Sequence, residues 1–105
     1  MYRVTTSTCT FTLPDNTSSY SIIQVAFRQE NITLVKQYEN ATCPDGMELD
    51  GKDVIITLTQ AETKAFREGI IQAQVRVLTN DNKAFASQMF NVSVDEVINE
   101  VILHV

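Results

Sequence analysis

The chain of 105 residues contains 44% hydrophobic and 20% charged residues and has a net charge of -5. A chain of this length forms one domain and buries roughly two thirds of its unfolded surface. The composition excludes disorder and a membrane span, and the acidic balance excludes the basic patch that nucleic-acid binding requires. We therefore expect one globular domain that binds neither nucleic acid nor membrane.

The beginning of the chain, Met1-Tyr2-Arg3-Val4, has neither the charged region nor the apolar region of a secretion signal. The sequence therefore predicts a protein that is not exported. In the cytoplasm, Cys9 and Cys43 are expected to be free thiols, because cytosolic proteins rarely keep disulfides. A disulfide between them is the alternative if strands bring them together.

Alternating apolar residues predict three strands in the first part of the chain. They span residues 8–13, 19–29 and 32–38. In the second, Ile23, Val25 and Phe27 share one face, which is the period of a half-buried strand. Residues 30–31 suit a tight connection, so the second and third strands are expected to form a hairpin. Lys36 is an exception on the otherwise apolar face of the third strand.

Two Asp-Gly dipeptides, Asp45-Gly46 and Asp50-Gly51, punctuate the next stretch. Asp-Gly is a strong hairpin signal because it tolerates a positive φ. We expect a short strand over residues 47–49 that folds back on a strand over residues 54–58.

The alternation stops between residues 59 and 69. Thr59 and Glu62 form a capping box, and Gly69 is suited to stop a helix. This pattern predicts a helix of about two turns that bridges two strands.

Alternation resumes in two later strands, over residues 69–78 and 84–94, separated by turn chemistry at residues 80–82. Six or seven short strands with one short helix predict an all-β fold. The expected architecture is an antiparallel two-sheet immunoglobulin-like β-sandwich over residues 1–94.

The last segment, residues 95–105, is an apolar C-terminal tail. Ser93 and Glu96 form a second candidate capping box at its start. One interpretation packs the tail on the domain's own sheet, and the other makes it an oligomer or partner contact, because large exposed apolar patches mark interfaces. The second interpretation makes the following residues candidates for partner binding: Val97, Ile98, Val101, Ile102 and Leu103.

No catalytic or cofactor-binding constellation stands out. The single histidine, His104, is one residue from the end of the chain and is poorly placed for a nucleophile–base pair. Two cysteines and one histidine do not make a zinc site. An acidic cluster offers oxygen ligands for calcium but lacks the spacing of a calcium loop. The aspartates of its Asp-Gly dipeptides are explained by the backbone requirements of turns. That cluster consists of Asp45, Glu48, Asp50 and Asp53. We expect no enzyme, no metal and no cofactor.

Three stretches carry a resemblance to a known family. The first is residues 10–14 (Thr-Phe-Thr-Leu-Pro). The second is residues 58–63 (Leu-Thr-Gln-Ala-Glu-Thr), and its pattern continues through Phe66, Gly69, Gln72 and residues 74–76. The third is residues 80–87 (Asn-Asp-Asn-Lys-Ala-Phe-Ala-Ser). This pattern resembles small structural proteins of tailed phages and prophages. The nearest named relative is the immunoglobulin-like N-terminal domain of phage baseplate upper proteins.

The resemblance implies a virion structural or assembly protein of the tail or baseplate. Such a protein is made in the host cytoplasm and then enters the virion. Its partners would be further copies of itself or a larger phage tail protein, with no cofactor. The residues themselves favour two surfaces for assembly, an edge strand and the tail. The alternatives are an immunoglobulin-like adhesion or carbohydrate-binding module and a small hydrolase with converging carboxylates.

Overall fold

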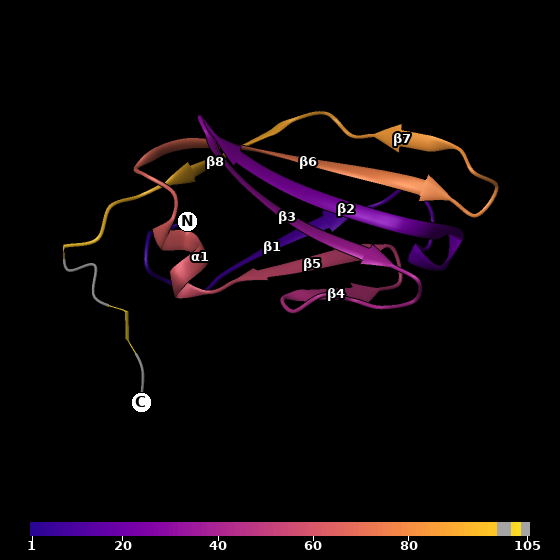
Figure 1. The fold of residues 1–105 in the computed structure, drawn as a ribbon, viewed down its shortest axis with the longest axis horizontal. Coiled ribbons are helices and arrows are strands. Elements are labelled where there is room, and N and C mark those ends of the chain that lie inside the picture. The colour runs from indigo at the N-terminus through magenta and orange to yellow at the C-terminus, as the bar shows by residue number, and fades with distance from the viewer. Residues whose placement is uncertain (99–101, 104–105) are drawn as a thin grey trace.

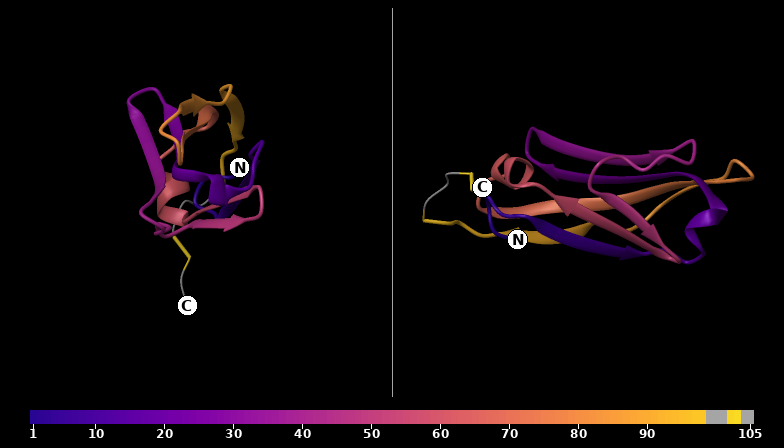
Figure 2. Two further views of the ribbon diagram at one scale, coloured as in Figure 1. Left: turned by 90° about the vertical axis from the view of Figure 1, so that its right-hand side faces the viewer. Right: turned by 90° about the horizontal axis from the view of Figure 1, so that it is seen from below.

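A computed structural model describes residues 1–98, 102 and 103, which form two antiparallel sheets packed face to face (Figures 1 and 2). The first sheet has the order β1 (Ser7–Thr12), β5 (Asp53–Leu58), β4 (Met47–Asp50). The second has the order β3 (Ile32–Glu39), β2 (Tyr20–Gln29), β6 (Gly69–Thr79), and β6 then pairs with both β7 (Ala84–Ala86) and β8 (Phe90–Val94). Every predicted strand has a counterpart, although the one predicted over residues 84–94 is divided into β7 and β8, and the expected all-β sandwich is confirmed.

The strand order identifies the type of sandwich. An immunoglobulin domain pairs its strands as A-B-E-D in one sheet and as C-F-G, with an added C′, in the other. With β1 in the place of B, the observed orders are B-E-D and C′-C-F-G. Among the described residues, no strand occupies the place of A beside β1. The extreme N-terminus pairs instead with the residue that follows β8, through a parallel bridge between Tyr2 and Asp95.

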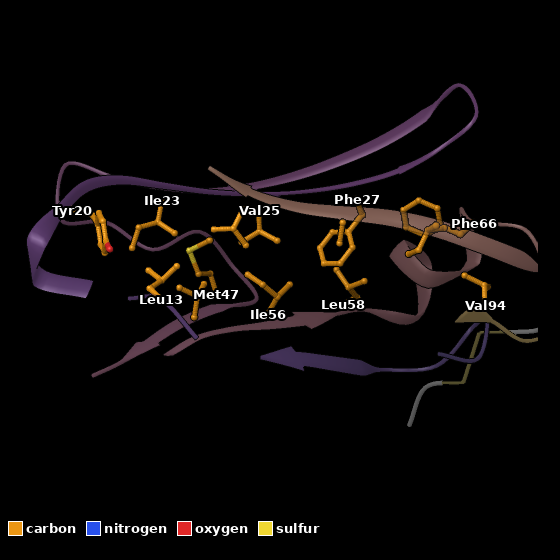
Figure 3. Packing of buried hydrophobic residues seen from close by; sticks show 14 residues of the cluster. Leu13, Tyr20, Ile23, Val25, Phe27, Met47, Ile56, Leu58, Phe66 and Val94 are labelled. Carbon is orange, nitrogen blue, oxygen red and sulfur yellow. The ribbon is translucent and has the colours of Figure 1, made fainter. Parts of the chain in front are cut away.

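The core lies between the sheets because alternate residues of the central strands face inward (Figure 3). Ile23, Val25 and Phe27 of β2 are fully buried, as predicted. They meet fully buried residues of β5 (Val54, Ile56 and Leu58) and of β6 (Ile71). The alternation therefore places one apolar face of each sheet against the other.

The predicted helix is present but shorter than two turns. α1 covers Gln60–Lys64, and the capping box is confirmed: the Thr59 hydroxyl accepts from the Glu62 N–H, and the Glu62 carboxylate accepts from the Thr59 N–H. The prediction that Gly69 ends the helix is wrong, because Gly69 is the first residue of β6. Its φ of +132° is a backbone conformation that favours glycine. Of the described helices, none has the length and apolar character needed to span a membrane.

The last predicted strand, residues 84–94, is interrupted. β7 and β8 both pair with β6, but residues 87–89 leave the regular ladder. The Ser87 hydroxyl accepts from the Val75 N–H, and the Gln74 side chain donates to the Ser87 carbonyl. A serine hydroxyl that takes a strand N–H competes with regular pairing. The continuous strand predicted here was therefore wrong at its centre.

Two predictions about the C-terminal segment are also wrong for the described residues. Ser93 lies within β8 and caps no helix, because Asp95 continues into backbone pairing with the N-terminal segment. The interpretation that packs the tail on the domain's own sheet is also wrong for Ile98 and Leu103: the Ile98 side chain is fully exposed, and Leu103 forms backbone hydrogen bonds to the Gln60 side chain on α1.

Candidate apolar groove beside a free strand edge

An open groove of about 900 Å³ lies at the side of the sandwich. It lies between β1 in one sheet and β7 and β8 in the other, where strand A of an immunoglobulin domain would stand. The lining residues are mostly apolar: Cys9, Thr10, Phe11, Thr12, Leu13, Pro14, Asp15, Tyr20, Val75, Val77, Thr79, Phe85, Ala86, Ser87, Phe90 and Val92. Asp15 is the single charged member of this set.

Aromatic side chains bridge the groove. The Phe11 ring from β1 lies 5.8 Å from the Phe90 ring on β8 and 6.4 Å from the core ring of Phe27, measured between centroids. Tilted pairs at these separations are favourable. Phe85 and Phe90 nevertheless remain 58% and 44% exposed. The rim of the groove therefore presents apolar surface that the described chain does not cover.

One wall of the groove is a free sheet edge. β1 pairs along its whole length with β5, from Ser7 opposite Leu58 to Thr12 opposite Asp53. It pairs with no second described strand. Because only one edge of β1 is hydrogen-bonded to a neighbour, the backbone groups along its other edge are available to a further strand.

Cys9 lines the groove from β1. Burial raises the pKa of its thiol, an effect that the nearby N-terminal ammonium group partly opposes. The thiol is therefore neutral at neutral pH and poorly nucleophilic. Cys43 is exposed, and both cysteines are free. The geometry gives Cys9 the role of a small apolar wall residue.

The candidate tail residues that the structure describes lie away from the groove, at the α1 end of the molecule. Val97 is half-buried, Ile98 is fully exposed, Ile102 is 37% exposed and Leu103 is 75% exposed. Val101 lies outside the described residues. The described tail is therefore a second apolar surface, separate from the groove.

Two members of the acidic cluster around β4 take part in hydrogen bonds within the fold. Asp53 accepts a hydrogen bond from the Thr12 hydroxyl, and the Asp45 carbonyl accepts one from Lys36. Within residues 1–98, 102 and 103, no group of three or more His, Cys, Asp or Glu side chains is arranged to hold a metal ion.

The groove residues Phe85 and Phe90 were not singled out from sequence. The sequence does contain an indication of the other wall of the groove, β1, because residues 4–14 form a run without a single charge in a chain that is 20% charged. What the run could not reveal is that its strand lies at an edge. Edge position depends on long-range strand order, which alternation along one strand does not encode.

Comparison with protein-family models, curated proteins and solved structures finds no match. The residues that carry the resemblance to phage proteins have structural roles here: Thr59 and Glu62 cap α1, Phe66 is fully buried, and Asn80 bonds to the 18–19 backbone. These roles fit a sandwich of any function.

Proposed function

We propose that the chain is a structural assembly module that acts through protein–protein contacts and performs no catalysis. One observation supports this proposal above the others: an apolar groove runs beneath the free edge of β1. An edge strand supplies unpaired N–H and C=O groups to an incoming strand, and the groove supplies pockets for its alternate side chains. The two features that strand addition requires, a free strand edge and an apolar groove, therefore lie side by side.

The setting we propose is a phage or prophage virion, at the tail or baseplate. The support is the sequence resemblance over residues 10–14, 58–63 and 80–87. In this setting the protein is made in the host cytoplasm and then built into the particle, beside copies of itself or a larger tail protein. No cofactor, membrane or nucleic acid takes part.

The groove is less suited to the alternative of carbohydrate binding. Sugar recognition requires several converging polar groups, whereas the groove offers Asp15 and a few hydroxyls among apolar walls. An adhesion role would also place the protein at the cell surface and not in a particle.

Mass spectrometry of density-purified particles, after prophage induction of the source strain, tests the proposal. We expect the chain in tailed particles at a constant ratio to other tail proteins. Its absence from particles, together with its recovery from the cell surface, would reject the virion setting in favour of adhesion.

A further inference from the structure

Of the four sheet edges that the described strands form, β1 alone lacks protection against strand pairing. Natural edges are protected by charges, prolines, bulges or short strands. The β4 edge carries Glu48 and Asp50, the β3 edge carries Lys36 and Glu39, and the β7–β8 edge is broken at residues 87–89. β1 reads Ser-Thr-Cys-Thr-Phe-Thr, with no charge, proline or break. It is therefore the edge where a further strand pairs at the lowest cost.

The chemistry of the groove defines the incoming strand. Its walls are apolar, so the strand must bring apolar side chains on one face and carry no charge there. Its other face meets solvent beside Thr8, Thr10 and Thr12, which are all exposed. Threonine pairs across strands favourably with threonine. A strand that alternates threonine with apolar residues satisfies both faces.

We propose that the occupant is β1 of a second copy of this chain, paired antiparallel to the first about a two-fold axis perpendicular to the sheet. This inference rests on the proposed function of assembly through protein contacts. Such an axis places like faces together, so Cys9 and Phe11 of the second copy turn toward the groove mouths while its threonines stay outside. The two three-stranded sheets then continue into one another.

The electrostatics favour this approach over others. Each copy has a net charge of -5, so two copies repel one another over most of their surfaces. The groove face has Asp15 as its one charged lining residue. Few like charges would therefore face one another where the two β1 strands meet.

The arrangement also covers exposed apolar surface. In the two-fold pair the two groove mouths face one another, and the exposed rings of Phe85 and Phe90 stand at their rims. A symmetric interface of this kind uses the same patch on both subunits and closes at two. We therefore infer a dimer and not a filament.

The test compares the oligomeric state of the full chain with that of two matched variants. Light scattering after size exclusion, over a dilution series, is expected to give a dimer for the unmodified chain. The double variant Thr8→Lys/Thr10→Lys places like charges on both β1 strands and is expected to be a monomer. The control, Thr33→Lys/Val35→Lys, puts the same charges at exposed positions of the β3 edge and is expected to remain a dimer.

Both variants add two lysines and change the net charge equally, so they differ chiefly in which sheet edge carries the added charges. Thermal melting confirms that each is folded. Hydrogen exchange supplies a second readout: amides on the free side of β1 should become protected as concentration rises in the unmodified chain, and not in Thr8→Lys/Thr10→Lys.

A monomer at all concentrations would overturn the inference, and so would a dimer that survives the β1 lysines. A monomer that carries an apolar small molecule in native mass spectrometry would overturn it as well. None of these results removes the chain from purified particles, so failure of the dimer is distinct from failure of the proposed function.

Discussion

Lys36 interrupts the apolar face of β3 because it has a specific partner. Its ammonium group lies 2.8 Å from the Glu62 carboxylate on α1 and also donates to the Asp45 carbonyl. The side chains of the ion pair are only 11% and 20% exposed. Partial burial alone would raise the pKa of Glu62, but the hydrogen bonds from Lys36 and from the Thr59 N–H, with the Lys36 charge, outweigh burial and lower the pKa. The pair therefore ties the helix to the second sheet.

The depressed pKa sets the pH range in which this pair stabilises the fold. The contribution is complete above the ordinary value of 4.5 and is lost as the pH falls through the lower value in the folded state. Glu62→Gln keeps a residue that can cap α1 but removes the charge. We expect it to lower the free energy of unfolding by about 1–2 kcal/mol at pH 7. Urea titrations across pH 3–7 should show that the difference narrows in acid.

Glu30→Gln is the matched control for that substitution. Glu30 pairs with Arg67, but both side chains are largely exposed, at 67% and 71%. Solvent screens such a pair, and its loss should cost less than about 0.5 kcal/mol. Equal losses for the two variants would contradict the role given to burial at Lys36 and Glu62.

At the scale of elements, the two Asp-Gly turns that flank β4 are not equivalent. Both glycines have positive φ, +80° at Gly46 and +60° at Gly51. A Cβ at Gly46 would come within 2.4 Å of the Thr57 carbonyl oxygen, whereas a Cβ at Gly51 meets nothing within 4 Å. Gly51→Ala should therefore cost the backbone penalty of roughly 1–2 kcal/mol, and Gly46→Ala should cost distinctly more. Chemical denaturation of the two variants measures the difference, and equal midpoints would be the contrary result.

The elements also show how far sequence reasoning reaches. Alternation in β2 and β6, the β4–β5 hairpin and the Thr59 cap are local signals, and each was predicted within a few residues. The break at Ser87 was missed, because it arises from hydroxyl and amide bonds across to β6 that become possible only after the strands align. The groove was missed for the same kind of reason. Its walls, β1 and β8, are distant in sequence and meet only through strand order.

At the scale of the whole molecule, the core is complete without the described tail. Phe66 and Val94 close the α1 end of the core, and both are almost fully buried (Figure 3). Ile98 is fully exposed, and Leu103 reaches Gln60 through backbone atoms that any residue would supply. The side chains of Ile98 and Leu103 therefore add little to the folding free energy.

This separation between core and tail yields a prediction for Ile98→Asp/Leu103→Asp. The unfolding free energy should change by less than about 0.5 kcal/mol, because both side chains are already in water. Phe66→Ala is the positive control and should cost about 3–5 kcal/mol, because it empties a fully buried site. Since β1 and not the tail forms the inferred dimer contact, the tail variant should also remain dimeric in light scattering. A large loss of stability would show that these tail side chains belong to the core. A monomer would show that the assembly surface lies at the α1 end and not at β1.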